Sequence, residues 1–420
     1  MLESLRLKDV GPASSLEIAF SKRLNVFTGD NGLGKSFLLD IAWWSCTGAW
    51  AGLPASPRRG EGAKPRMDVQ FTGSAPAAKR AQGSLFNFQA DEWVFQGVRL
   101  TPASLVIYAR VDGGFSVWDP ARNSWNDGLR ASEWRPRMFH FSADTLWNGL
   151  EENGETLCNG LIRDWVAWQN QPRTSPFALL KSVVARLSPS PGEPIDIGAP
   201  VRLSAVNVKD FPTLSLPYGE VALPHASAAV RRIVSLAYLV TWAWDEHKRA
   251  SRLRNQRTVP DVVLMIDEVE SHLHPLWQRT IVPSLLDLGQ ALEAQVDFQL
   301  LATTHAPLVL ASIEPHFDQD RDSLFLFALD AKDREVSLRK VPWARQGDAV
   351  GWLTSPVFGL DQARSREAEM AIEAAEAFMR GDTKKLPRGL KTKAAIHKAL
   401  ERSLPGMDPF WPRWIVEARP

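Results

Sequence analysis

Eight residues near the amino end of the chain combine the groups that bind a nucleotide phosphate. They read GDNGLGKS and fit the phosphate-loop pattern G-x-x-x-x-G-K-[ST]. Glycines let backbone N–H groups converge on phosphate oxygens, while the lysine reaches the β- and γ-phosphates and the hydroxyl reaches Mg²⁺. The sequence therefore predicts binding of Mg·ATP or a related nucleotide, with Ser36 also a metal ligand. The predicted phosphate-binding residues are Gly29, Asp30, Asn31, Gly32, Leu33, Gly34, Lys35 and Ser36.

The segments beside this loop predict the elements that must position it. Residues 24–27 form an apolar run typical of a strand, and residues 37–44 form an apolar segment long enough for a helix. The amino end of a helix behind the loop adds a dipole that favours anionic groups. Strand, loop and helix together are the context that a phosphate loop requires.

A second apolar run, residues 262–266, ends in two carboxylates. Its β-branched composition predicts a strand that is buried in a parallel sheet. Asp267, at the tip of that strand, is a predicted Mg²⁺ ligand. Glu268, the next residue, is the predicted general base that polarises the attacking water.

A third segment, FQLLATTHAP at residues 298–307, predicts another buried strand with polar residues at its end. The strand ends in Thr303, Thr304 and His305. A histidine at this tip is suited to contact the γ-phosphate and sense its presence. His305 is therefore a predicted catalytic residue, together with Glu268 and Lys35.

These segments together resemble the ABC/SMC-like ATPases of the RecF and OLD type, which are P-loop proteins of the AAA family. The matching motifs are TGDNGLGKS at residues 28–36, IDEVESHLHP at 266–275 and TTHAP at 303–307. The resemblance implies an α/β fold: an ABC/SMC-type head with a mixed sheet, an antiparallel β-subdomain and a helical lobe, plus a small C-terminal helical extension. It also makes residues 270–274 the D-loop and His305 the switch histidine.

Members of this family bind each ATP between two subunits, and a signature serine at the start of a helix reaches the partner's nucleotide. Residues 225–232, HASAAVRR, match this signature best, which makes Ser227 a predicted ATP-binding residue in trans. Ala228 stands where the family has glycine, and alanine keeps the backbone farther from the phosphate. Residues 217–220, PYGE, are an alternative that has the glycine and the glutamate but lacks the serine.

The family's Q-loop glutamine has three candidates, Gln70, Gln89 and Gln96, and the sequence does not choose between them.

Composition excludes several classes of protein. The 420 residues carry a net charge of +1, so the chain has no global field that attracts nucleic acid. Two cysteines, Cys46 and Cys158, fit a reducing compartment rather than a disulfide framework. The first residues do not read as a signal peptide, and no window has the roughly 18 apolar residues of a membrane helix. We therefore expect a cytoplasmic protein without a membrane segment.

The chain is predicted to hold an ATPase domain over residues 1–360, with a helical lobe at roughly 143–250, and a C-terminal helical extension over 361–420. Alternation of apolar and polar residues predicts two strands before the phosphate loop. The other expected elements are a surface loop over 51–84, strands over 85–118 with a hairpin turn at 112–114, helices over 143–187, a strand pair over 324–341 and helices over 361–402.

Taken together, these features predict slow, Mg-dependent ATP hydrolysis that acts as a switch between closed and open homodimers or higher oligomers. Sustained heptads are absent, so the long arms of true SMC proteins are not expected. Compact proteins similar to this one include ATPase subunits of bacterial anti-phage defence systems, which pair with a separate nuclease, often of the HNH type. Two alternatives stay open: a RecF-like repair ATPase that contacts DNA or RNA through the basic runs at 248–257 and 380–402, and a nucleotide-gated scaffold with negligible turnover.

Overall fold

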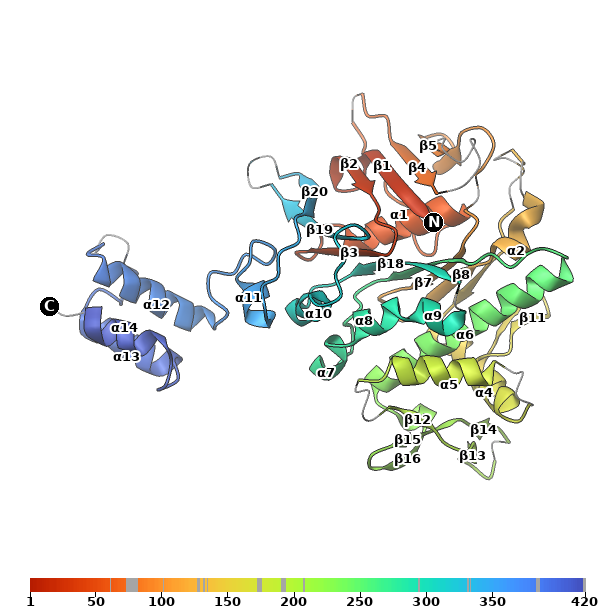
Figure 1. The fold of residues 1–420 in the computed structure, drawn as a ribbon. Helices are drawn as coiled ribbons and strands as arrows, with labels where there is room; N and C mark the ends of the chain where they lie inside the picture. The colour runs from red at the N-terminus through yellow and green to blue at the C-terminus, as the bar shows by residue number, and fades with distance from the viewer. Residues whose placement is uncertain are drawn as a thin grey trace. The chain divides into compact units, whose positions relative to one another are not determined.

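The computed structural model divides the chain into two compact units, residues 1–345 and residues 346–420 (Figure 1). Among the described residues, no helix is both long enough and apolar enough to cross a membrane. The structure describes residues 1–417 apart from 61, 73–81, 101, 127–128, 131–132, 134, 172–175, 190–193, 207, 294, 331, 333 and 383–385.

An eight-stranded mixed sheet forms the centre of the first unit. Its five middle strands are parallel, so their carboxyl ends meet along one edge. The three remaining strands pair antiparallel at the two sides. In order across the sheet the strands are β20 (Val336–Val341), β19 (Asp322–Leu329), β3 (Leu24–Gly29), β18 (Asp297–Thr303), β17 (Asp261–Ile266), β7 (Leu105–Ala109), β8 (Phe115–Trp118) and β9 (Met138–Phe141).

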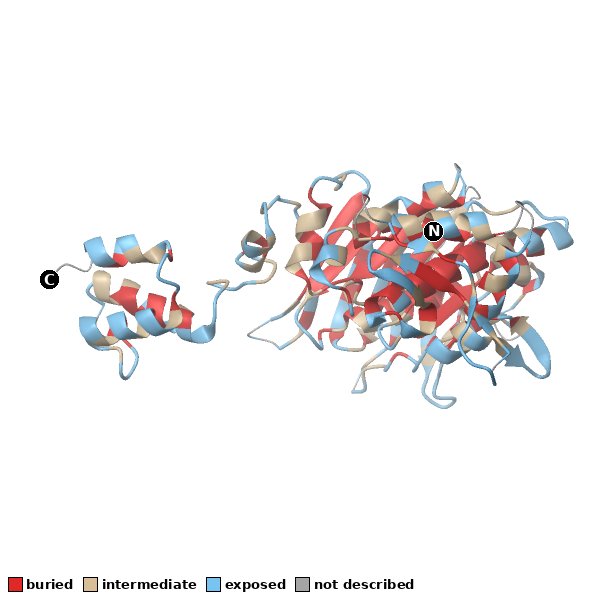
Figure 2. Ribbon diagram, turned by 90° about the horizontal axis from the view of Figure 1, so that it is seen from below, coloured by how far each residue is buried: buried red, intermediate tan, exposed pale blue. Residues whose placement is uncertain are grey.

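The middle strands are mostly apolar and buried because both faces of the sheet are covered. On one face, α1 (Lys35–Thr47) lies between the large sheet and a second, five-stranded sheet. On the other face lie α6 (Ala228–Leu253), α8 (Ile281–Leu286) and α9 (Leu288–Leu292). Figure 2 shows the resulting core as the buried centre of this unit. Helices on both faces of the large sheet confirm the predicted α/β architecture.

The second sheet is antiparallel, as the predicted β-subdomain requires. Its strands, in order, are β2 (Ala13–Ala19), β1 (Leu2–Val10), β4 (Arg66–Phe71), β5 (Gln82–Asn87) and β6 (Glu92–Phe95). The expected surface loop over 51–84 is therefore wrong where β4 forms, because Met67, Val69 and Phe71 bury their side chains. The predicted hairpin at 112–114 is confirmed, but its strands β7 and β8 belong to the large sheet.

The segment after β9 contains more strand than the sequence suggested. Helix α3 (Ala143–Asn148) is followed by a hairpin of β10 (Leu150–Glu152) and β11 (Glu155–Cys158), so the prediction of continuous helix over 143–187 is wrong there. The turn residues Asn153 and Gly154 both have positive φ, which is the requirement of a two-residue hairpin turn. The described helices α4 (Leu161–Gln169) and α5 (Phe177–Arg186) follow, and then the short strands β12 (Asp196–Ile197), β13 (Val201–Arg202), β14 (Asp210–Phe211), β15 (Thr213–Leu216) and β16 (Gly219–Ala222).

Helix α6 is anchored to the large sheet by a buried histidine. The backbone N–H of Val259 donates to His247 Nε2 over 3.1 Å, so the ring proton is on Nδ1. Nδ1 then donates to the Asp119 carboxylate over 2.6 Å, and Asp119 in turn caps the short helix α2 (Pro120–Asn123). This chain of contacts fixes α6 relative to the strands that carry the predicted carboxylates.

Short helices complete the first unit: α7 (Pro275–Gln278) and α10 (Pro307–Ile313) follow the β17 and β18 loops. The second unit contains α11 (Ala349–Leu353), α12 (Arg366–Met379), α13 (Lys393–Ser403) and α14 (Phe410–Glu417). It has its own core, in which Trp414 is 1% exposed and packs edge-on against Phe378 (Figure 2).

Candidate functional site

The phosphate loop connects β3 to α1 through backbone conformations that suit glycine. Gly29, Gly32 and Gly34 have φ angles of 131°, 76° and 98°, in the region that L side chains rarely adopt. A Cβ on Gly29 would also lie 2.2 Å from the carbonyl oxygen of Phe327 on the neighbouring strand β19. The glycine pattern that identified the loop in the sequence is therefore a geometric requirement at these positions.

The ammonium group of Lys35 lies at the centre of this loop. Its Nζ donates to the carbonyl oxygens of Gly29 over 2.8 Å and of Asp30 over 2.7 Å. Burial lowers the pKa of Lys35, while the nearby carboxylates, among them Glu268 and Asp267, act in the opposite direction. A buried cation that faces carboxylates and loop carbonyls has the chemistry to hold a phosphate.

Thr303 contacts both Asp267, the predicted Mg²⁺ ligand, and Glu268, the predicted general base. Its hydroxyl donates to Asp267 Oδ1 over 2.7 Å and accepts the backbone N–H of Glu268 over 2.7 Å. Asp267 is 1% exposed and Thr303 is fully buried. Because β17 and β18 are parallel neighbours, their carboxyl ends place these groups side by side.

The side chains of Glu268 and His305 face each other at this edge, with His305 Nε2 lying 3.9 Å from Glu268 Oε1. Both side chains are partly exposed, at 38% and 30%, so solvent reaches them. Glu268 has a φ of 48°, which a glutamate adopts only at an energetic cost. Backbone strain of this kind concentrates at functional sites.

Asp40, on α1, lies at the margin of this site and was not foreseen from the sequence. Tyr108 on β7 donates its hydroxyl proton to Asp40 Oδ1 over 3.0 Å. Burial raises the pKa of Asp40 to about 6, and the negative charge of Asp267 acts in the same direction. In the sequence, Asp40 is a single aspartate in an apolar helix, and that feature alone does not indicate a functional residue.

The carboxyl end of β7 adds a group of charged residues to the same edge. Arg232, near the start of α6, donates to the carbonyl oxygen of Arg110 over 3.1 Å. Burial lowers the pKa of Arg232, and the charges of Asp112, Asp267 and Glu268 counteract this effect. The sequence placed Arg232 in the predicted signature segment but gave it no contact at this edge, because only the packing of α6 against β7 brings Arg232 to Arg110.

Ser227, the predicted signature serine, is the N-cap of α6, and its hydroxyl accepts the N–H of Val230 over 3.3 Å. Ser227 is exposed, so the amino end of a 26-residue helix is open to solvent there. Ala228, Arg232 and His272 line an adjoining cavity of about 500 Å³. The alternative signature, residues 217–220, comprises the turn after β15 and the first two residues of β16, and it begins no helix.

The three Q-loop candidates lie in the antiparallel sheet or its turns. Gln70 is on β4, where its side chain accepts the Ser4 hydroxyl. Gln89 is in the turn between β5 and β6, and Gln96 follows β6. None of the three is at the carboxyl end of β7, the strand next to β17.

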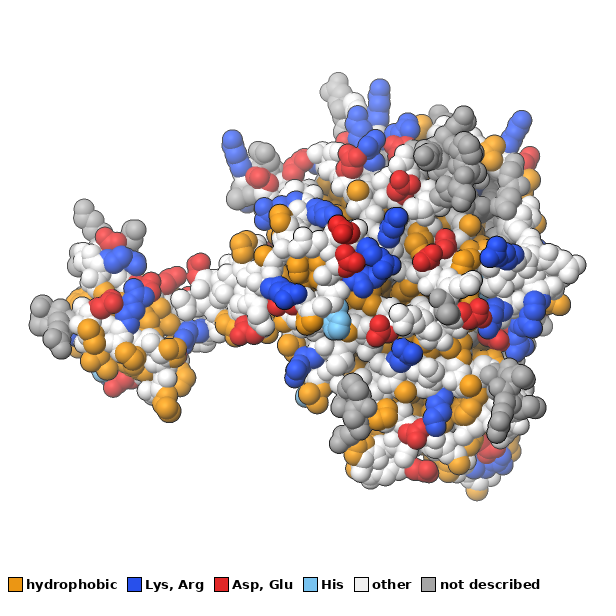
Figure 3. Space-filling model, viewed as in Figure 1, with side chains coloured by type: hydrophobic (Ala, Val, Ile, Leu, Met, Phe, Trp, Pro, Cys, Tyr) orange, Lys and Arg blue, Asp and Glu red, His pale blue; other side chains and the backbone are white. Residues whose placement is uncertain are grey.

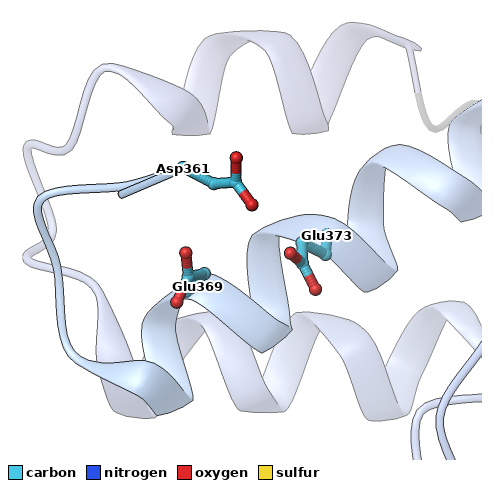
Figure 4. A group of neighbouring side chains, drawn as sticks. All are labelled: Asp361, Glu369 and Glu373. Carbon is cyan, nitrogen blue, oxygen red and sulfur yellow. The ribbon is translucent and has the colours of Figure 1, made fainter. Parts of the chain in front are cut away.

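Two other features attract attention but are separate from this edge. A cavity of about 1310 Å³ lies among α4, α6 and the β10–β11 hairpin, and no phosphate-loop residue lines it. In the second unit the carboxylates of Asp361, Glu369 and Glu373 lie within 4.8 Å of one another (Figure 4). Carboxylates as exposed as these are common without an ion.

The phosphate loop, the Asp267–Thr303–Glu268 cluster and the parallel sheet together form the arrangement of a P-loop nucleotide-binding domain. Two family profiles match the chain at the segments that build the site. Residues 4–91 match an AAA domain, and residues 221–311 match the family described as "AAA domain, putative AbiEii toxin, Type IV TA system".

Individual relatives are similar over different lengths. The chain is 21% identical to the Septu protein PtuA of Bacillus thuringiensis over 392 residues, which cover 90% of this chain and 88% of that protein. It is 33% identical to the Septu protein PtuA of Bacillus mycoides (strain KBAB4) over 99 residues, 23% of this chain and 12% of that protein. A shorter match of 51 residues, at 39% identity, joins 12% of this chain to 9% of the "Retron Vc95 probable ATPase" of Vibrio cholerae serotype O1 biovar El Tor.

Among solved structures, the SMC head domain from Thermotoga maritima is similar with a TM-score of 0.42 and 15% identity, covering 81% of this chain and 99% of that one.

Proposed function

We propose that this chain binds Mg·ATP at the carboxyl edge of its large sheet and hydrolyses it to ADP and phosphate. One observation carries the proposal: Asp267, Glu268 and His305 lie together near Thr303 at one edge of the sheet. The charges of Asp267 and Glu268 also act on the pKa of Lys35, so the ammonium group lies near both carboxylates. Phosphoryl transfer requires positioned charges rather than covalent chemistry from the protein, and this cluster supplies them.

The residues present fit both the nucleotide and its metal. Lys35 and the loop N–H groups of residues 29–36 would hold the phosphates, while the Ser36 hydroxyl and the Asp267 carboxylate would hold Mg²⁺. Thr303 donates a hydrogen bond to Asp267 Oδ1, and a carboxylate is a hard oxygen ligand of the kind that Mg²⁺ prefers. When bound, Mg²⁺ would neutralise charge on the β- and γ-phosphates.

Glu268 is proposed as the general base, since its carboxylate is partly exposed and can contact water. His305 would contact the γ-phosphate beside it and register whether that phosphate is present. Because the two side chains are 3.9 Å apart, one water or phosphate oxygen can contact both.

We further propose that two copies of the chain close around ATP, with Ser227 of one reaching the nucleotide of the other. The support is the exposed amino end of α6, whose N–H groups and dipole favour an anion. ATP would then close the assembly, and hydrolysis would release it.

The proposed biological role is that of the ATPase subunit of an anti-phage defence complex with a partner nuclease, such as one of the HNH type. Its support is the similarity to the Septu protein PtuA of Bacillus thuringiensis over nine-tenths of the chain. DNA binding through the basic runs is less favoured, because Lys248 pairs with Glu293 and Arg249 with Asp245. On the face shown in Figure 3, basic and acidic side chains are interspersed. Within the run 380–402, residues 383–385 lie outside the described part of the chain.

The test is the solution mass of Glu268→Gln with and without Mg·ATP, measured by light scattering after size exclusion. Removal of the general base should trap ATP and give a larger species, which Ser227→Arg should abolish. Ser365→Arg is the matched control, because Ser365 caps α12 as Ser227 caps α6. A wild-type chain that binds ATP but releases no phosphate would contradict the ATPase proposal and favour a nucleotide-gated scaffold.

A further inference from the structure

We propose that Glu270 is a positioning residue, which fixes the backbone of His305 and so holds the imidazole against Glu268. The inference rests on the proposed function, in which His305 acts at the γ-phosphate. Glu270 belongs neither to the phosphate-loop motif nor to the carboxylate pair after β17. The inference therefore assigns it a role that these two motifs do not.

The contact that carries the inference joins two different loops of the site. The backbone N–H of His305, after β18, donates to Glu270 Oε1 over 2.5 Å. Glu270 is only two residues beyond Glu268, so the same turn supplies the proposed general base and the anchor of the histidine. A hydrogen bond to a charged acceptor is stronger than one between neutral groups, so this contact can set the position of the loop.

The turn that presents Glu270 is itself held in a defined shape. Glu268 and His272, on either side, have φ angles of 48° and 63°. The N–H of Ser271 donates to the carbonyl of Glu268 over 2.8 Å, and the N–H of Leu273 donates to the carbonyl of Glu270 over 2.9 Å. A turn of this kind, bonded within itself and strained, delivers the Glu270 carboxylate to one place.

Glu270 is also directed toward the catalytic groups rather than toward solvent. Its second oxygen, Oε2, is buried and has no hydrogen-bond partner among the described residues. The charge of Glu270 reaches Lys35, where it opposes the effect of burial on the pKa of the ammonium. A half-buried carboxylate that keeps one oxygen unpaired costs free energy, which indicates a role beyond folding.

The expected consequence is a change in turnover with nucleotide affinity largely preserved. Lys35 and the loop N–H groups of residues 29–36 hold the phosphates without Glu270. His305, by contrast, loses its backbone anchor when Glu270 is truncated, and a displacement of about 1 Å in a catalytic group can cost about 100-fold in rate. The loss should therefore appear in kcat.

The experiment compares Glu270→Ala, Glu270→Gln, His305→Ala and the double variant Glu270→Ala/His305→Ala. We expect kcat of Glu270→Ala to fall about 10- to 100-fold, with the affinity for a fluorescent ATP analogue within about threefold of wild type. Glu270→Gln keeps an acceptor oxygen and should lose less. If Glu270 acts through His305, the double variant should be no slower than His305→Ala. Glu293→Ala, at an exposed glutamate that pairs with Lys248, is the matched control and should leave kcat unchanged.

Hydrogen exchange gives a readout that does not depend on catalysis. The His305 amide should exchange faster in Glu270→Ala than in wild type, since this variant removes the acceptor of that N–H. Additive losses in the double variant, or unchanged exchange at His305, would overturn the inference. If the wild-type chain hydrolyses no ATP, the proposed function fails, yet the exchange measurement still decides whether Glu270 holds the His305 backbone.

Discussion

Replacement of Thr303 by valine tests whether the positions of Asp267 and Glu268 depend on a single hydroxyl. Valine matches threonine in shape, so the packing of this fully buried position stays close to native. It removes the donor to Asp267 Oδ1 and the acceptor for the Glu268 N–H, each at 2.7 Å. Thr303→Ser keeps the hydroxyl and removes only a methyl group, which makes it the matched control.

The magnitude follows from these two bonds. A hydrogen bond to a charged group contributes about 1.5–3 kcal/mol, and a buried N–H left without an acceptor costs about 1–3 kcal/mol. Thr303→Val should therefore lower the free energy of unfolding by about 3 kcal/mol in the absence of nucleotide. Because both carboxylates lose their fixed position, kcat should fall about 100-fold. Thr303→Ser should cost about 1 kcal/mol and less than about threefold in kcat.

Urea denaturation without nucleotide and steady-state phosphate release measure the two effects. If Thr303→Val and Thr303→Ser unfold at the same urea concentration and hydrolyse ATP equally fast, the hydroxyl does not organise the site. A loss of stability in Thr303→Val with unchanged turnover would restrict the hydroxyl to a structural role.

Arg23 makes two hydrogen bonds to Asp322, whose side chain is fully buried. Arg23→Ala should therefore lower the free energy of unfolding by about 3 kcal/mol. Arg6→Ala, which removes an exposed ion pair, is the control and should not shift the urea midpoint. Equal midpoints for both variants would contradict this. Burial raises the pKa of Asp40 to about 6 from an ordinary value near 3.8, so the folded state binds a proton that the unfolded chain releases. The contribution of Asp40 to stability is thus present at low pH and lost as the pH rises from about 4 to about 6. Asp40→Asn should lose less stability than wild type over that interval in urea titrations without nucleotide, and parallel pH profiles would show that Asp40 titrates normally. Gly29→Ala should abolish binding of a fluorescent ATP analogue, because the new Cβ would clash with the Phe327 carbonyl and the φ of Gly29 is 131°. Native affinity in this variant would refute the account of the loop.

Much of the site could be predicted from the sequence because its chemistry is encoded in short segments. The glycines, Lys35 and Ser36 work through the dihedral angles and side chains of one loop between a strand and a helix. Asp267 and His305 come directly after apolar runs, and the carboxyl ends of parallel strands meet at one edge. The roles assigned to these residues, including that of Ser227 in trans, stay predictions until the proposed experiments are done.

The errors in the predicted elements have local physical reasons. Gly, Pro and Arg dominate the composition around residues 66–71 and predict a loop, yet three alternating apolar residues suffice for a strand beside β1. Leucines in the β10–β11 hairpin fall at helical spacing and predict a helix, while Asn153-Gly154 carries the stronger signal.

The sequence by itself determined the nucleotide-binding chemistry, since a phosphate loop needs only neighbouring residues with the right conformations and charges. The tertiary structure decided which distant groups complete it. It placed β7 beside β17, which brings Tyr108 to Asp40. It also placed Thr303 against Asp267, and Glu270 against the backbone of His305. These contacts depend on strand order and register, and those are set by the packing of the whole sheet rather than by any one segment.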